Sequence, residues 1–161
     1  MDFKYFFKRK EAFMNRTIST LLTLGAGALF STSVFAASLN GTQWQTIDDK
    51  TGEKKAVVQL SENGGKVSGK IIKVLNREKA DEVCTKCPGS LKNKPVEGLQ
   101  ILTGLKADGS NQWSDGKLID PESGKTYSGK LTLSDNGQSL QLRGYVGSPV
   151  FGRSQTWQRI K

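Results

Sequence analysis

Histidine is absent from all 161 residues of the sequence. It is the usual general base of enzymes and a frequent metal ligand, and it titrates near neutral pH. Its absence excludes a Ser-His or Cys-His nucleophilic centre. An enzyme would need a carboxylate or tyrosine centre instead, such as Asp120 with Tyr127. No G-x-S-x-G elbow, phosphate loop or metal-ligand cluster is present, so we expect no enzymatic activity, no metal and no cofactor.

Cysteine is nearly as scarce, because Cys84 and Cys87 are the only two. Two thiols without histidine cannot complete a four-ligand zinc site, and Pro88 after Cys87 excludes c-type haem attachment. A redox role would need a helix N-terminus in a βαβ context, which the surrounding pattern does not predict. In an oxidising compartment the two should instead form a structural disulfide that closes a very short ring.

Long apolar runs are also missing, apart from residues 18–30, which follow Arg16. Small residues then lead to Ala36, as at a signal-peptide cleavage site. The run is shorter than the roughly 20 residues that span a bilayer. We expect residues 1–36 to be a cleavable signal peptide helix, cut after Ala36 or, alternatively, after Ala37. Translation can start at Met1 or Met14. The protein is then periplasmic or secreted.

Residues 37–161 are the size of a single domain. They carry 19 lysines and arginines against 13 aspartates and glutamates, a net charge of +6. This excess favours acidic partners such as lipid headgroups or anionic glycans. The basic residues are dispersed, however, which favours a solvated surface and argues against nucleic acid as a partner. No feature of the sequence predicts an oligomeric state.

Glycine is abundant, with 18 residues, and it recurs in short polar turns. Asn-Gly and Asp-Gly pairs supply the positive φ that tight hairpins require. These turns are Asp49-Lys50-Thr51-Gly52, Glu62-Asn63-Gly64-Gly65, Asp108-Gly109, Glu122-Ser123-Gly124 and Asp135-Asn136-Gly137. They predict a meander of antiparallel strands.

Eight segments between these turns alternate apolar and polar residues, as half-buried strands do. They are residues 42–47, 55–60, 66–75, 99–105, 112–119, 126–133, 139–146 and 154–160. In the fourth, the pattern places Leu99, Ile101, Thr103 and Leu105 on one side. The fold class is therefore all-β, with a small up-and-down antiparallel barrel of about eight strands favoured over a two-sheet sandwich.

The connection 76–97 is the only long one between the predicted strands, and it contains the two cysteines. Loops of this length are usually functional or flexible. We expect the loop to lie over a barrel mouth as a disulfide-stapled lid.

Two aromatic groups are candidates for special roles. Trp44 and Arg159 lie on the first and last strands, where a cation–π contact would close the barrel; the alternative is a core tryptophan and a surface charge. Trp113, Tyr127, Phe151 and Trp157 are candidates for an aromatic ligand mouth, although aromatic residues at strand spacing are more often core.

Two acidic segments, Asp48-Asp49 and Asp120-Pro121, could serve acid–base chemistry. Each lies beside a turn glycine, Gly52 or Gly124, where aspartate is preferred for its local backbone hydrogen bonds. We therefore interpret them as turn residues.

Several motifs in this order resemble a bacterial exported family catalogued as domain of unknown function 2147. The matching residues include Trp44-x-Thr46-x-Asp48-Asp49-x-Thr51-Gly52, Gly69-Lys70-Ile71, Cys84-x-x-Cys87-x-Gly89, Asp120-Pro121-x-x-Gly124-Lys125-x-Tyr127 and Phe151-Gly152-Arg153-x-x-x-Trp157. The resemblance covers nearly all of residues 37–161. It implies a lipocalin- or calycin-like barrel in the Gram-negative envelope, and no established activity.

Barrel mouths are common ligand sites, and an aromatic lining with a few polar groups suits amphipathic molecules. We therefore expect a non-enzymatic protein that binds a small apolar or amphipathic ligand in its lumen. The alternative is an envelope interaction module that binds glycan, lipid or a partner protein through its outer surface.

Overall fold

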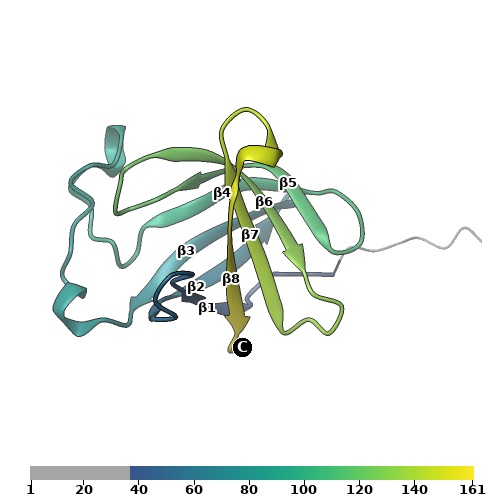
Figure 1. Ribbon diagram of the computed structural model, residues 1–161, viewed down its shortest axis with the longest axis horizontal. Coiled ribbons are helices and arrows are strands. Elements are labelled where there is room, and N and C mark those ends of the chain that lie inside the picture. Colours follow the sequence, from purple (N-terminus) through teal and green to yellow (C-terminus); the bar gives the residue numbers. More distant parts are fainter. Residues whose placement is uncertain (1–36) are drawn as a thin grey trace, which may run out of the picture. The chain divides into compact units, whose positions relative to one another are not determined.

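Eight antiparallel strands close into a barrel in the computed structural model, which describes residues 37–161 (Figure 1). The strands are β1 (Gln43–Ile47), β2 (Lys54–Asn63), β3 (Lys66–Val74), β4 (Gln100–Ala107), β5 (Gln112–Ile119), β6 (Thr126–Leu133), β7 (Ser139–Tyr145) and β8 (Arg153–Arg159). Three short 3-10 helices are η1 (Arg77–Lys79), η2 (Gly89–Leu91) and η3 (Pro149–Phe151). The predicted all-β barrel is confirmed, whereas the predicted signal peptide lies outside the described residues. No helix among the described residues is long and apolar enough to cross a membrane.

Pairing between the first and last strands distinguishes this barrel from the sandwich alternative. Each strand pairs with its sequence neighbour, and β1 also pairs with β8 in the register Trp44↔Arg159 to Thr46↔Trp157. Closure satisfies the backbone groups that two free edge strands would expose.

The two ends of the barrel differ in their connections. We call the end with connections 48–53, 75–99, 120–125 and 146–152 the loop end, and the opposite end the closed end. In Figure 1 the C terminus lies at the closed end, and the yellow β7–β8 connection lies away from it. The closed end has only tight hairpins and the segment that precedes β1.

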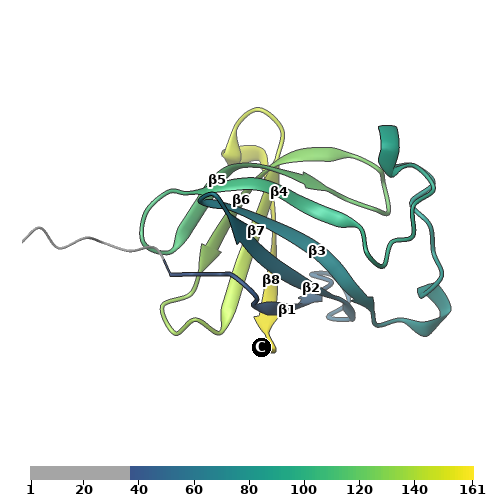
Figure 2. The ribbon, with the colours of Figure 1, turned by 180° about the vertical axis from the view of Figure 1, so that it is seen from behind.

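That segment, residues 37–42, crosses the closed end. The backbone N–H of Ala37 donates to the carbonyl of Ser110 in the β4–β5 turn (3.1 Å), and the Leu39 side chain is fully buried. Thr42 Oγ1 donates to the Leu39 carbonyl (2.6 Å) and accepts from the indole of Trp44 (2.8 Å). Figure 2 shows this dark segment running from beside the β4–β5 turn to β1. It forms the floor of the barrel.

Arg159 lies beside this floor. Its guanidinium carbon is 5.7 Å from the centroid of the Trp44 ring, and the two residues are direct cross-strand partners. A cation at this distance from an indole contributes about 0.5–1 kcal/mol when it is exposed to solvent. Arg159 Nη1 also donates to the carbonyl of Gly137 (3.4 Å), which ties β8 to the β6–β7 turn.

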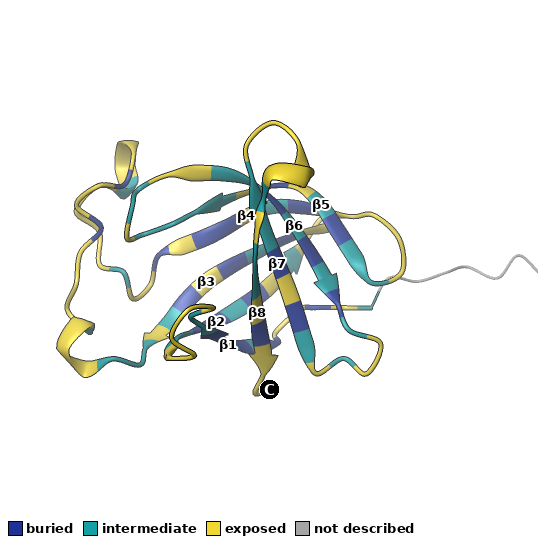
Figure 3. Ribbon diagram, viewed as in Figure 1, coloured by how far each residue is buried: buried dark blue, intermediate teal, exposed yellow. Residues whose placement is uncertain are grey.

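Leucines fill the middle of the barrel beside glycines on the inner face. A Cβ built on Gly69 would lie 3.0 Å from atoms of both Leu60 and Leu102, and one built on Gly116 would lie 2.3 Å from Leu105 Cγ. Figure 3 shows buried positions alternating with exposed ones along the strands. The glycines on the inner face therefore leave room for neighbouring leucine side chains and do not form an open channel.

Of the residues predicted to share one side, Leu99, Ile101 and Leu105 are buried, but the prediction was wrong at Thr103. Thr103 is exposed, while Leu102 and Leu105 are fully buried. The register against β3 shifts on both sides of Leu102, and Gly104 has a φ of +73°. These irregularities are β-bulges, which turn the following side chains to the other face and so break a period of two.

Gly116 and Gly129 are inner-face glycines that pair across β5 and β6. Because the core is filled, we expect alanine to change the free energy of unfolding differently at the two positions. We expect Gly116→Ala to lower the free energy of unfolding by about 1–3 kcal/mol, because Leu105 must move. Gly129→Ala should be close to neutral, since its Cβ would meet its nearest atoms at 3.7–3.8 Å. Urea unfolding of both variants measures the difference. Equal losses would show that the core yields at Gly116.

Candidate functional site at the loop end

The inner face of the barrel becomes accessible to solvent toward the loop end. Along β8, inward-facing Trp157 is buried, Gln155 is half-buried and Arg153 is exposed. Along β6, Gly129 is buried and Tyr127 is half-buried. At the closed end the inward-facing tryptophans and leucines are almost completely buried. A molecule approaching the lumen would therefore meet it at the loop end.

The accessible inner face has an apolar side. Leu118 of β5 and Tyr127 of β6 are cross-strand partners, and both are half-buried. Ala56 of β2 and Val74 of β3 form a second such pair. Leu118, Ala56 and Val74 pack against the buried core, so the apolar surface continues inward from the loop end.

The other side of the inner face, on β1 and β8, is polar. Gln155 Oε1 accepts a hydrogen bond from the indole of Trp157 (2.7 Å). Thr46 Oγ1 accepts from the backbone N–H of Ala56 (3.0 Å). Arg153 follows Gln155 on the same face. The inner face thus joins an apolar wall to a polar one.

Two turns of the same design lie at the loop end, 48–53 and 120–125. In each, the glycine N–H donates to the aspartate carbonyl, from Gly52 to Asp48 and from Gly124 to Asp120, both at 2.8 Å. The Asp48 carboxylate also accepts from the backbone N–H of Thr51 (2.9 Å). These aspartates organise their turns, as the sequence indicated.

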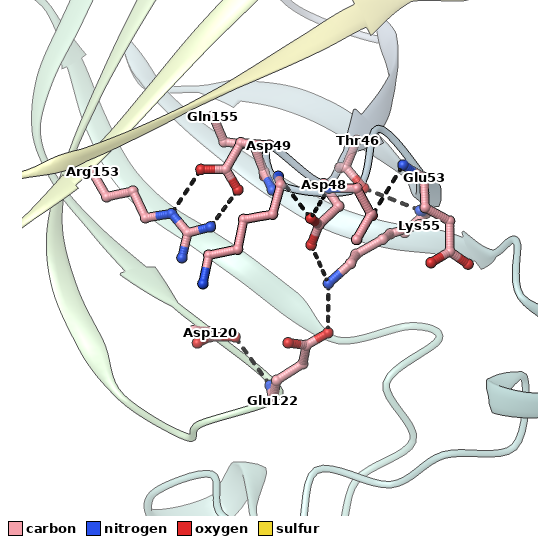
Figure 4. A network of polar contacts seen from close by, with 12 residues as sticks. Thr46, Asp48, Asp49, Glu53, Lys55, Asp120, Glu122, Arg153 and Gln155 are labelled. Carbon is pink, nitrogen blue, oxygen red and sulfur yellow. Dashed lines mark hydrogen bonds and ion pairs between the residues drawn. The ribbon is translucent and has the colours of Figure 1, made fainter.

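Lys55 of β2 joins the two turns. Its Nζ lies 2.9 Å from Oδ2 of Asp48 and 2.9 Å from Oε1 of Glu122 (Figure 4). Glu122 belongs to the β5–β6 turn, and neither β5 nor β6 neighbours β2 in the sheet. We call this contact the Lys55 bridge. It spans the loop end between strands that the barrel itself does not pair.

A second ion pair lies next to the bridge. Nε of Arg153 donates to Oδ2 of Asp49 (2.8 Å), and Nη2 donates to the other carboxylate oxygen. This bidentate pair fastens the start of β8 to the β1–β2 turn (Figure 4). Within residues 37–161, no grouping of three or more cysteine and carboxylate side chains suits a metal ion.

The ion pairs shift the pKa values of Asp48, Asp49 and Lys55. The Lys55 hydrogen bond holds the pKa of Asp48 well below its ordinary value of 3.8, helped by the backbone N–H groups of Thr51 and Lys50. The same hydrogen bond, followed by the one to Glu122, raises the pKa of Lys55. Hydrogen bonding to Arg153 lowers the pKa of Asp49. Asp48, Asp49 and Lys55 are therefore charged at neutral pH.

The long β3–β4 connection is stapled as predicted. Cys84 and Cys87 form a disulfide, and both are almost fully buried. The backbone N–H of Cys84 donates to the Lys94 carbonyl (2.8 Å), and that of Asn93 donates to the Cys84 carbonyl (2.9 Å). These backbone hydrogen bonds hold the two arms of the connection together, while the disulfide closes a short ring within one arm.

The stapled segment packs on the β5–β6 turn. Sγ of Cys84 lies 3.3 Å from the Pro121 carbonyl oxygen, a van der Waals contact because a bridged sulfur carries no hydrogen. A Cβ on Gly124 would lie only 1.9 Å from the carbonyl oxygen of Lys86. The connection is therefore built against the turn that carries Glu122. Its role as a lid stays a prediction.

The four aromatic residues predicted to line one mouth do not gather there. Trp113 and Trp157 are 1% exposed and belong to the core toward the closed end, Tyr127 lies on the inner face at the loop end, and Phe151 projects from the β7–β8 connection with 85% exposure. Strand direction explains the correction. Trp113 follows the short β4–β5 turn, so it lies at the end opposite the long connection.

The structure also adds residues that sequence reasoning missed, namely Lys55, Glu122, Arg153 and Gln155. The repeated pattern Ile-Asp-x-x-Thr/Ser-Gly at residues 47–52 and 119–124 was the one signal that the two turns are alike. Nothing local to the sequence indicated that a lysine joins them.

Two shallow depressions lie elsewhere on the described surface. One, of about 240 Å³, lies over β6, β7 and β8 and includes Thr132, Gln141 and Thr156. These three residues form one outward-facing cross-strand row. The other, of about 280 Å³, lies between Leu91 and Gln100 of the long connection. Neither includes an inner-face residue of the loop end.

Acid should weaken the Lys55 bridge. A carboxyl whose folded pKa is lowered contributes stability above its ordinary pKa and loses it as the pH falls through the lowered value. We expect Lys55→Gln to be destabilising at pH 7 and its deficit relative to wild type to shrink below about pH 4. Urea unfolding across this range measures it, with Lys54→Gln as the control on an exposed neighbour. Parallel curves for Lys55→Gln and wild type would contradict the assignment.

Docking of the stapled connection can be tested at the two equivalent turn glycines. Gly124 and Gly52 have φ values of +70° and +72°, so alanine strains both alike. A Cβ at Gly52 meets nothing within 4 Å, whereas one at Gly124 displaces Lys86. We expect Gly124→Ala, unlike Gly52→Ala, to speed hydrogen exchange at the Cys84 and Asn93 amides at least tenfold. Similar hydrogen exchange in both variants would show that the structure of the connection does not depend on its packing against the β5–β6 turn.

Comparisons with known proteins agree with the fold. A solved structure described as "Protein HP1028 from the human pathogen Helicobacter pylori belongs to the lipocalin family" is similar, with 25% sequence identity and a TM-score of 0.67 over 78% of this chain and 85% of that chain. No curated protein matches the sequence. Residues 42–159 match the family described as "Uncharacterized protein conserved in bacteria (DUF2147)". The chain therefore belongs to this bacterial family, with a lipocalin-like barrel.

Proposed function

We propose that this protein is a non-enzymatic binding protein that takes a small amphipathic molecule at the loop end of its barrel. The observation that carries the proposal is the two-sided inner face. Leu118 and Tyr127 on β5 and β6 offer apolar contact, and Gln155 and Arg153 on β8 offer polar contact. Largely apolar sites with a few placed polar groups are typical of small-molecule binding.

The filled core limits where such a ligand can lie. Leucines occupy the space beside Gly69 and Gly116, and the tryptophans are sealed toward the closed end. The proposed ligand is therefore held in the outer part of the lumen, beneath the Lys55 bridge. A similar structure described as a lipocalin supports a binding role, because this fold is generally associated with small hydrophobic ligands.

Export is part of the proposal. A signal peptide in residues 1–36 would place the barrel in the periplasm or outside the cell. Cleavage after Ala36 would leave Ala37 as the first residue, and its nitrogen already donates to the Ser110 carbonyl. The new terminus would then lie at the closed end, away from the proposed site.

A second candidate function is an envelope interaction module that uses the outer surface. The leucine-filled middle of the barrel favours it, because little of the lumen is left for a ligand. The two candidates differ in which face matters, so matched variants on the two faces separate them.

Tyr127 and Tyr145 provide such a matched pair. Ser128 pairs with Tyr145 and Gly129 with Gly144, so Tyr127 faces inward and Tyr145 outward at the same level, each half-buried. The probe is 1-anilinonaphthalene-8-sulfonate, an amphipathic dye that fluoresces in apolar surroundings. We expect Tyr127→Ala to weaken dye binding about tenfold and Tyr145→Ala to leave it unchanged.

Native mass spectrometry of protein recovered from the envelope complements the dye. We expect a chain that begins at Ala37 or Ser38 with a small molecule attached, which dissociation and fragmentation would identify. A bare chain together with equal dye binding by the two tyrosine variants would reject the inner-face site. Dye binding that falls only in Tyr145→Ala would favour the outer-surface module.

A further inference from the structure

The β7–β8 connection carries the most exposed apolar side chains of the described residues. Phe151 is 85% exposed, Val150 77% and Val146 71%, and the next most exposed large hydrophobic residue, Ile160, lies at the closed end with 51%. Single exposed apolar residues are common and need no explanation. Three on one seven-residue connection form a local apolar surface, which we call the apolar tip. Figure 1 shows this connection projecting beyond the ends of β7 and β8.

The apolar tip is held in shape by polar contacts below it. Arg143 of β7 donates from Nε to the Pro149 carbonyl (2.7 Å) and from Nη2 to the Val150 carbonyl (3.2 Å). Its Nη1 donates to Ser154 Oγ (2.9 Å). One guanidinium thus ties the tip to the start of strand β8. Phe151 and Val150 are therefore exposed on a connection whose backbone is fixed by hydrogen bonds.

Backbone packing adds to this framework. Ser148 Oγ accepts from the backbone N–H of Val150 (3.3 Å) and caps η3. A Cβ on Gly152 would lie 2.8 Å from the Gly144 carbonyl oxygen and 3.0 Å from Tyr145 Cβ. The chain behind Phe151 is therefore pressed against β7, which leaves the phenyl ring on the solvent side.

Positive charge lies on the strands that support the tip. On the outer face, Lys130 of β6 is the direct cross-strand partner of Arg143, and Lys117 of β5 lies one row away, opposite Ser128. The nearby acidic groups Asp49 and Glu122 are already paired with Arg153 and Lys55. The net charge of residues 37–161 is +6. An apolar projection on a basic support fits an apolar layer beneath an anionic surface.

We propose that the apolar tip docks this protein on a bilayer surface that contains anionic phospholipids. Phe151 and Val150 would enter the interface between headgroups and acyl chains, while Lys130 and Lys117 attract the anionic headgroups. A projecting tip of three apolar residues is much smaller than the roughly 800 Å² per partner of a stable protein interface. A bilayer accepts such a projection because lipids rearrange around it. This docking does not depend on a ligand at the inner face.

The test is flotation of the protein, expressed from its full coding sequence, with vesicles of phosphatidylcholine containing about one third phosphatidylglycerol. We expect binding that is weaker on pure phosphatidylcholine and that falls as salt is raised. Phe151→Ser should reduce partitioning about tenfold or more. Ile160→Ser, which removes an exposed apolar side chain at the opposite end, should leave it unchanged. Thermal unfolding of both variants checks that the fold is intact.

Fluorescence gives a second readout at the tip itself. Trp44, Trp113 and Trp157 are buried, so their emission should not change on vesicles, and a change in the spectrum of Phe151→Trp reports the added tryptophan. We expect its emission to shift to the blue on anionic vesicles and to be quenched by brominated lipid chains, with no such change for Ile160→Trp. Failure to float with anionic vesicles, equal flotation of the two serine variants, or an unshifted Phe151→Trp emission would each overturn the proposal. Dye binding at the inner face would be unaffected by any of these outcomes.

Discussion

Pairing of β1 with β8 is the constraint on which every other feature of this structure depends. It consists of three register pairs, Trp44 to Thr46 against Trp157 to Arg159, and it gives the sheet an inside. In this closed sheet three tryptophans are buried on the inner face, and the two ends differ in chemistry. Trp44 and Trp157 lie in this seam, so the residues that close the barrel also form much of its core. Closure and packing are therefore one cooperative event.

The inner face divides along the barrel axis because side-chain size and polarity change together. Near the closed end, large apolar residues and leucine-filled glycine positions exclude water. Nearer the loop end, the inward positions of β6 and β8 hold Tyr127, Gln155 and Arg153. Stability is concentrated where solvent is absent, and the accessible half is left with groups that contribute less to the core. Binding sites are commonly placed on such rigid supports.

Local patterns predicted much of the fold. The eight strands and the disulfide followed from a period of two, from turn glycines and from two isolated cysteines, which are all short-range signals. The β4 bulge was not predicted, because Gly104 at positive φ interrupts the alternation of apolar and polar residues without the residue pattern of a turn. The Lys55 bridge was not predicted, because Lys55 and Glu122 are 67 residues apart in the sequence and no local pattern joins them. The prediction of a single aromatic mouth was wrong because successive connections lie at alternate ends of the barrel. Trp113 and the long connection are therefore far apart.

The Lys55 bridge has a consequence for the rate of access to the lumen. Lys55 and Glu122 are partly exposed, at 36% and 61%, and ion pairs in such surroundings are worth about 0–1 kcal/mol. At that strength the contact is broken in roughly a sixth or more of the molecules at equilibrium. Exposed side chains change rotamer within nanoseconds. The bridge therefore opens quickly without any backbone movement, so a slow step in the exchange of the proposed ligand would have to come from backbone motion.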